Sequence, residues 1–188
     1  MKAFSILIFI LFLFSCKPET ENRDHKVVIG ERNKNFTIVQ PNPEILITTS
    51  HQDSLDLNSD GIFEIRLTIS PIQTSTQPGF ETIISTKNNL QILLSELEFK
   101  DPDTLNISTI LDVDSNWSEP DPKWSANKYY NFTLSSYACY TSFHCLSSGN
   151  FGNVSGKYIG YKIGENLGWI LVDSYTSELR IKEYTVIR

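Results

Sequence analysis

The sequence has little positive charge, few cysteines and no long apolar stretch beyond its first residues. Lysine and arginine number 16, against 22 aspartate and glutamate residues, which gives a net charge of −6. An acidic chain is poorly suited to hold nucleic acid, whose phosphates require a basic surface. The composition therefore argues against a nucleic-acid partner. Because the one long apolar run lies within residues 1–16, the pattern also excludes a protein with several membrane spans.

Sequence signatures of catalysis are also missing. The chain contains no GxSxG, HExxH, P-loop or cysteine–histidine signature. A glycan-directed hydrolase with two carboxylates remains the catalytic alternative, because acidic residues are plentiful and their pairing is spatial. The sequence singles out no such pair. We therefore predict a protein that acts without catalysis, as a binding or structural component.

The N-terminal segment has the features of an export signal. Lys2 precedes a 12-residue apolar run over residues 3–14, a length typical of signal peptides and too short to span a bilayer. The run ends in L-F-S-C at residues 13–16, which resembles a bacterial lipobox with an unusually bulky Phe14. On this interpretation residues 1–15 are removed and Cys16 carries the lipid. An ordinary secretory signal that happens to end in cysteine is the alternative.

The residues after Cys16 have the composition of a tether. Residues 16–26 are polar, contain several charges and include Pro18, which is typical of a flexible linker. We predict a single folded domain over residues 27–188, held at the membrane through the N-terminal lipid. The predicted location is the cell envelope, at the outer membrane, facing either the periplasm or the cell exterior.

The two remaining cysteines have a spacing that suits a disulfide. Five residues separate Cys139 from Cys145 in C-Y-T-S-F-H-C, and an exported protein experiences oxidising conditions. A disulfide is the leading prediction. Two free thiols, or a metal site shared with His144, are the alternatives that this spacing leaves open.

The rest of the chain alternates as β-strands do. Apolar residues at odd positions from Phe63 to Ile69 alternate with polar ones, which predicts a half-buried strand. Similar short runs occur at residues 27–29, 36–39, 45–49, 82–86, 157–163, 167–172 and 179–187. The last run changes phase near Glu183, which indicates a β-bulge. We predict an all-β domain, an antiparallel and jelly-roll-like β-sandwich.

Two segments fit this pattern less well. The leucines of residues 90–97 fall at helical spacing, which leaves room for one short helix, although Ile92 and the strand-rich context suit a strand almost as well. Residues 101–130 are polar and contain prolines. We expect a long loop or short paired strands there.

A cation-binding pattern lies in D-L-N-S-D-G-I-F-E, residues 56–64. Side-chain oxygens recur at its first, third, fifth and ninth positions, in Asp56, Asn58, Asp60 and Glu64. The Ile62 carbonyl offers a further ligand, Gly61 permits the sharp turn, and Asp53 could reach in from the preceding strand. Because Ca²⁺ takes roughly six to eight oxygen ligands, the spacing predicts a structural Ca²⁺ site. Residues 45–49 and 62–69 would form the two arms of a β-hairpin around it.

The alternative for this loop is a metal-free turn, since aspartate, asparagine and glycine all favour turns. A full EF-hand is excluded, because position 12 is Leu67 and strands flank the loop. Three carboxylates without a cation would repel one another, and this repulsion weighs against the metal-free turn.

Two stretches together resemble a β-sandwich family of exported bacterial, Bacteroidetes-like lipoproteins. The first is LDLNSDGIFEIRL, similar to the family's DLNxDGxxDF calcium-type hairpin, with Glu64 in place of aspartate. The second is GKYIGYKIGENLGWILVDSYTSELRIKEYTV, similar to its C-terminal strands, with Leu167 as a departure before Gly168. The matching positions are Asp56, Asn58, Asp60, Glu64, Tyr158, Gly160, Tyr161, Gly168 and Trp169. The resemblance implies a secreted β-sandwich and no enzymatic activity.

Aromatic residues in N-W-S-E-P-D-P-K-W, residues 116–124, suggest a second possible function. Trp117 and Trp124 beside acidic residues could form a platform that stacks on sugar rings, which would make the protein a surface glycan-binding module. The competing interpretation, which we favour, is that these side chains cap the core, because tryptophan is mostly buried in folded proteins. A protein partner at the cell surface is the remaining expectation.

Overall fold

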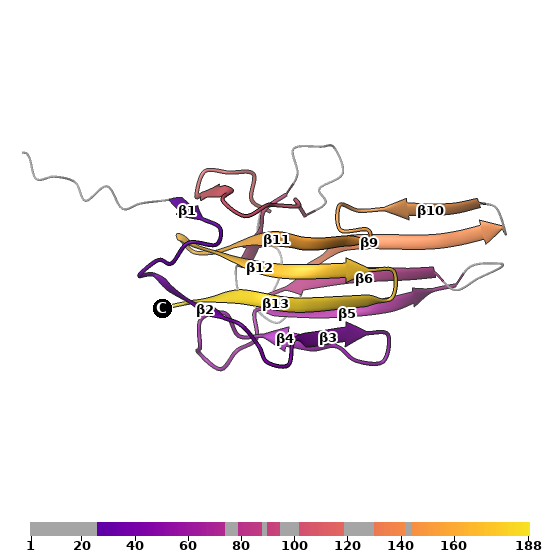
Figure 1. Ribbon diagram of the computed structural model, residues 1–188, viewed down its shortest axis with the longest axis horizontal. Helices are drawn as coiled ribbons and strands as arrows, with labels where there is room; N and C mark the ends of the chain where they lie inside the picture. Colours follow the sequence, from indigo (N-terminus) through magenta and orange to yellow (C-terminus); the bar gives the residue numbers. More distant parts are fainter. Residues whose placement is uncertain (1–25, 74–78, 88–89, 95–101, 119–129, 142–143) are drawn as a thin grey trace, which may run out of the picture.

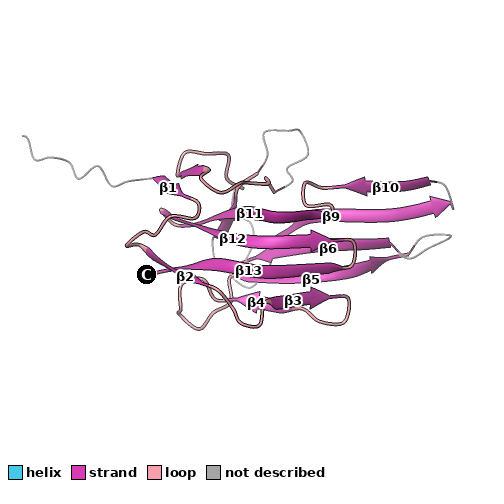
Figure 2. Ribbon diagram, in the orientation of Figure 1, coloured by secondary structure: helices cyan, strands magenta, loops and turns pink. Residues whose placement is uncertain are grey.

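The computed structural model describes residues 26–73, 79–87, 90–94, 102–118, 130–141 and 144–188. The regular elements in these ranges are all β-strands, so the predicted all-β class is confirmed. Figure 1 shows two sheets lying one over the other, with their strands along the long axis of the molecule, and Figure 2 shows the same strand-only architecture. None of the described segments is a helix with the length and apolar character needed to cross a membrane.

The first sheet has five antiparallel strands in the order β10-β9-β6-β5-β4. In chain order they are β4 (Asp53–Leu55), β5 (Ile65–Ile72), β6 (Gly79–Thr86), β9 (Tyr130–Thr141) and β10 (His144–Ser148). Three alternate residues of β5, Ile65, Leu67 and Ile69, are buried as their pattern predicts. The prediction that Phe63 extends this pattern is wrong. The strand begins at Ile65, and Phe63 is 52% exposed. The preceding loop instead directs the side chain of the next residue, Glu64, inward.

The second sheet has the order β2-β13-β12-β11-β7, and β3 also pairs with β13. Its strands are β2 (Phe36–Val39), β3 (Ile45–Thr48), β7 (Leu90–Ile92), β11 (Val154–Ile163), β12 (Asn166–Tyr175) and β13 (Glu178–Ile187). The predicted bulge in the last strand is confirmed. Leu171 pairs with Glu183 and Val172 with Ile181, which leaves Lys182 as the extra residue.

The main core lies between the two sheets. Buried side chains from β5, β6 and β9 meet those from β11, β12 and β13. A second apolar cluster covers the other face of β11 and β12, beneath β1 (Lys26–Val28) and β8 (Ile110–Asp112), which pair with each other. Strand β12 is therefore buried on both faces: Ile170 and Val172 enter the main core, and Leu167 and Trp169 the second cluster. This explains its nearly continuous apolar sequence.

Two further sequence predictions need correction. Residues 90–92 form strand β7, which pairs with β11, and Leu93 and Leu94 continue as isolated bridges, so the strand alternative holds in place of the short helix. Residues 95–97 lie outside the described residues. Residues 45–48 form β3, which pairs with β13 of the second sheet and not with β5. The chain crosses between the sheets after the Thr48–His51 bridge, so that the shorter β4 becomes the hairpin partner of β5.

The predicted disulfide is confirmed. Cys139 and Cys145 are opposite each other in the β9–β10 hairpin and are joined, with their Cα atoms 3.9 Å apart. This pairing uses both thiols, so the metal-site and free-thiol alternatives no longer apply. The bond lies at the edge of the first sheet, where β9 is the one neighbour of β10 among the described strands.

Candidate metal centre

The loop of residues 56–64 connects β4 to β5 and is tied to both sheets. The Leu57 side chain is fully buried in the main core. Its carbonyl accepts a hydrogen bond of 2.7 Å from the Ile187 amide at the end of β13, in the opposite sheet. Its own amide donates to Glu64 Oε2 at 2.8 Å. A residue of apolar character inside a polar loop thus anchors the loop to the fold.

Successive side chains of the loop accept hydrogen bonds from backbone amides two residues ahead. Asp56 accepts from the amide of Asn58, Asn58 from that of Asp60, and Asp60 from that of Ile62, at distances of 3.3, 3.0 and 2.7 Å. Asp56 Oδ2 also accepts from the Gly61 amide at 2.9 Å. Gly61 has a φ of +83°, a left-handed conformation that glycine adopts without strain. These Asx turns fold the loop back on itself.

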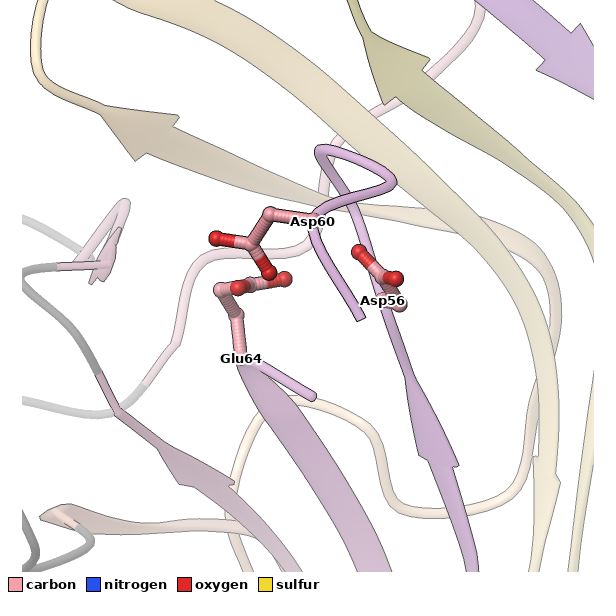
Figure 3. A group of neighbouring side chains, drawn as sticks. All are labelled: Asp56, Asp60 and Glu64. Carbon is pink, nitrogen blue, oxygen red and sulfur yellow. The ribbon is translucent and has the colours of Figure 1, made fainter. Parts of the chain in front are cut away.

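This folding brings three carboxylates together. Ligand oxygens of Asp56, Asp60 and Glu64 lie within 4.8 Å of one another. Figure 3 shows the side chains gathered around a common centre, with Glu64 at the end of the loop, directly before β5. The side-chain amide of Asn58 lies beside them and donates to Asp60 Oδ2 at 3.1 Å. Like charges at this separation repel one another, and a hard cation bound between them would offset that repulsion.

Glu64 is the buried member of the group. Its side chain is 0% exposed, and while Oε2 accepts from the Leu57 amide, Oε1 has no hydrogen-bond partner within the described structure. Burial raises the pKa of Glu64, and the charges of Asp60 and Asp56 raise it further, against the lowering effect of the Leu57 amide. A buried carboxylate oxygen without a donor costs free energy. One oxygen of this carboxylate lies within 4.8 Å of an oxygen of Asp56 and of Asp60, which is the environment a cation would complete.

The negative charge of the loop reaches the second sheet. Burial raises the pKa of Tyr184 on β13, and the charges of Asp53 and Asp56 raise it further. The pKa of Tyr161 on β11 is raised mainly by burial, with a contribution from Glu64. Both hydroxyls are therefore uncharged at neutral pH.

The predicted ligands fall into two sets. Asp56, Asn58, Asp60 and Glu64 are brought together as their spacing predicts. Ile62 lies in the same loop. Its side chain is 45% exposed, and its amide donates to Asp60 Oδ1. Asp53 instead lies in β4 opposite Leu67, where its Oδ1 accepts from the Ser54 amide, and it is not part of the carboxylate group. Leu57, which sequence reasoning missed, supplies the amide that positions Glu64.

The proposed sugar platform is not supported at Trp117. This side chain is 7% exposed in the second cluster, and its indole N–H donates to the Asp112 carbonyl at 2.8 Å. The Lys162 ammonium lies 5.7 Å from the ring centroid. Trp117 therefore caps the core, as the favoured interpretation predicts. Cys16 and Trp124 lie outside the described residues.

No protein family model matches the chain, and neither a curated protein nor a solved structure shows significant similarity to it.

Proposed function

We propose that the protein is a lipid-anchored component of the bacterial cell envelope, with a non-catalytic binding or structural role and a fold stabilised by Ca²⁺. The calcium part rests on one observation, the fully buried Glu64 oxygen that lacks a donor beside two other carboxylates. The hydrogen bonds of a metal-free turn account for Asp56 and Asp60. They do not account for Glu64 Oε1.

The donor set fits Ca²⁺. Side-chain oxygens of Asp56, Asn58, Asp60 and Glu64, a backbone carbonyl at Ile62 and water together reach the number of oxygen ligands this ion takes. Three carboxylates also give a net charge that suits a divalent cation. Because Leu57 links the loop to β13, an ion held there would fasten the first sheet to the second. Its role is therefore structural.

The envelope part rests on the N-terminal residues and on the disulfide. The lipobox-like end of the apolar run supports lipidation of Cys16. A disulfide between Cys139 and Cys145 suits an exported protein, because cytosolic proteins seldom keep such bonds. Both features support a location in the cell envelope.

The test of the calcium site is a thermal melt in EDTA and in millimolar Ca²⁺. A chain that begins at Lys17 retains every residue of the described fold, which starts at Lys26. Ca²⁺ at about a hundred times its dissociation constant stabilises the folded state by about 2.7 kcal/mol, which raises Tm by roughly 5–10 °C for a domain of this size.

The Asp60→Ala variant should lose this rise and keep the wild-type Tm in EDTA to within a few degrees. Asp114→Ala, which removes an exposed aspartate from a turn outside the loop, is the matched control and should respond to Ca²⁺ as the wild type does. If all three chains respond alike, the loop does not bind the ion.

A glycan-binding module is the second candidate, and a cavity of about 210 Å³ supports it. The cavity lies where β6, β9 and β10 meet the β12–β13 turn. Aromatic and hydroxyl-bearing side chains line it, namely Phe80, Tyr137, Tyr175, Ser135, Ser136, Ser147 and Thr176, beside Gly152 and Asn153. Such a lining suits a neutral sugar ring. The Tyr175→Ala variant should then lose binding on a glycan array.

The hydrolase alternative has weaker support than the binding roles. Its chemistry requires two carboxylates that touch the glycosidic bond. Glu64 is fully buried, so it cannot be one of these two carboxylates.

A further inference from the structure

A second cavity, far from the β12–β13 turn, has the chemistry of an anion site. It has a volume of about 560 Å³ and lies where the β1–β2 loop meets the ends of β2 and β13. Its lining residues are Gly30, Arg32, Asn33, Phe36, Thr37, Ile38, Gln40, Glu183 and Arg188. The side chains of this cavity, with two guanidinium groups and one carboxylate, sum to a charge of +1, in a chain whose net charge is −6.

The single carboxylate in the lining is already engaged by neutral donors. Glu183 Oε1 accepts from the Trp169 indole N–H at 3.0 Å, and Oε2 accepts from the Gln40 amide at 2.9 Å. Trp169 is itself fully buried and packs edge-on against Phe36, with ring centroids 4.8 Å apart. Glu183 is therefore fixed in the wall of the cavity and is not the ion-pair partner of either arginine.

One of the two arginines is held in place. The Arg188 amide donates to the Asn35 carbonyl at 2.9 Å, and its Nε donates to Thr37 Oγ1 at 3.0 Å. With Nε engaged, the terminal nitrogens of the guanidinium remain to donate elsewhere. Neither Arg32 nor Arg188 forms an ion pair with a carboxylate of the described residues. A guanidinium positioned in this way matches the paired oxygens of a phosphate or carboxylate.

We infer that this cavity binds an oxyanion, with Arg188 as the fixed donor and exposed Arg32 as the second donor. The ligand chemistry is a phosphate or carboxylate group attached to a larger body, since the cavity exceeds the size of a single small ion. The cavity follows directly after β1, where the chain enters the fold from its N-terminal segment. A lipid headgroup and a soluble anion are the two sources of this chemistry.

The test measures binding to full-length protein in a neutral detergent, by calorimetry and by tryptophan fluorescence, for which buried Trp169 is the local reporter. Inorganic phosphate and glucuronate represent soluble oxyanions. Micelles doped with phosphatidylglycerol represent the headgroup, with phosphatidylcholine micelles as the zwitterionic reference. Saturable binding of at least one anionic probe, without binding to the reference, is the expected result.

Three variants separate the cavity from general charge effects. Arg32→Gln and Arg188→Gln should each weaken binding by about tenfold or more, the factor that one charge-assisted hydrogen bond provides. Arg180→Gln removes the same charge from β13 at a position eight residues away, about 26 Å along the strand, and should bind as the wild type does. Circular dichroism verifies that each variant is folded.

The probes also identify the source. Binding to phosphatidylglycerol micelles alone assigns the cavity to a headgroup, and binding to phosphate or glucuronate assigns it to a soluble anion. Failure of every anionic probe, or equal weakening by all three substitutions, overturns the inference. Both outcomes can be measured in EDTA and do not require the lipid at Cys16, so the proposed function stands or fails separately.

Discussion

Glu64 brings a carboxylate into a place where the fold provides a hydrogen bond for only one of its oxygens. Spacing in the sequence was enough to predict that Asp56, Asn58, Asp60 and Glu64 converge. It could not show that Glu64 would be fully buried, because that depends on where β5 begins and on the Leu57 side chain entering the core. The ligand set could therefore be predicted from the sequence, and the unpartnered oxygen that supports it could not.

The Glu64→Gln variant tests the charge of this side chain. Glutamine keeps the hydrogen bond from Leu57 and removes the repulsion from Asp56 and Asp60, so in EDTA the variant should be more stable than the wild type by roughly 1–2 kcal/mol. In millimolar Ca²⁺ the order should reverse, because only the wild type binds the ion. Urea unfolding in both buffers measures the difference. A variant that is less stable under both conditions would show that Glu64 serves packing alone.

Asp173 provides a pH-dependent contribution to stability that is independent of the loop. Burial alone would raise its pKa, but hydrogen bonds from Ser155 Oγ and the Gly156 amide, both 2.7 Å, and the Lys182 ammonium at 3.3 Å together hold the pKa below its usual value. These bonds secure the bulge of β11, where Ser155 and Gly156 are the unpaired residues. The ionised carboxylate therefore stabilises the folded chain.

The sign of this effect follows from the lowered pKa. The unfolded carboxyl has the ordinary value of 3.8, so the contribution is complete above that pH and is lost as the pH falls through the lower folded value. The Asp173→Asn variant should cost about 1–3 kcal/mol at neutral pH, and this difference should shrink below about pH 3.8. Urea unfolding of both chains from pH 7 to pH 3 measures it, and a difference that stays constant over this range would contradict the assignment.

At the scale of elements, the sequence indicated strands well and their partners poorly. The alternation in β5 and the phase change in β13 are local, and both are found in the structure. The pairing of β3 with β13 is a contact between distant segments, and a run such as I-L-I-T carries no mark of the sheet it joins. Runs that are adjacent in the sequence favour the prediction of a hairpin. Here that prediction paired β5 with β3, whereas its hairpin partner is the three-residue β4.

The helical spacing of the leucines in residues 90–97 misled for a related reason. Leu90 and Ile92 face the main core, while Leu93 belongs to the second cluster. A segment buried between two apolar clusters needs apolar residues on both sides, and this produces a spacing that resembles one helical face. The same two-sided burial accounts for the apolar run of β12.

The β9–β10 hairpin provides a prediction at this scale. Strand β10 is an edge strand, and its described side chains from Cys145 to Ser148 are exposed, so the disulfide is its main covalent restraint. Replacing both cysteines with serine should lower the free energy of unfolding by about 2 kcal/mol, the amount that closing a short loop provides. The response to Ca²⁺ should be unchanged. Hydrogen exchange should show faster opening confined to β10, and protection equal to the wild type there would contradict this role.

At the scale of the whole molecule, the two candidate sites share one connection. Leu57 is in the carboxylate loop, and its carbonyl accepts from the Ile187 amide at 2.7 Å. The next residue, Arg188, is the fixed guanidinium of the oxyanion cavity. If Ca²⁺ binds and orders the loop, we expect this hydrogen bond to order the end of β13 as well, and the position of Arg188 with it. Two sites joined in this way should bind their ligands cooperatively.

This coupling gives a reciprocal prediction. Saturating Ca²⁺ should strengthen phosphate binding by about fivefold or more, the lower range of coupling between linked sites, and phosphate should strengthen Ca²⁺ binding by the same factor. The Asp60→Ala variant, which leaves the cavity intact, should bind phosphate as the wild type does in EDTA and gain nothing from Ca²⁺. Calorimetric titrations of each ligand, with and without the other, measure both factors. Equal phosphate affinity with and without Ca²⁺ would mean that the Leu57–Ile187 hydrogen bond holds the loop to the sheet without transmitting order to Arg188, and the two sites would then act independently.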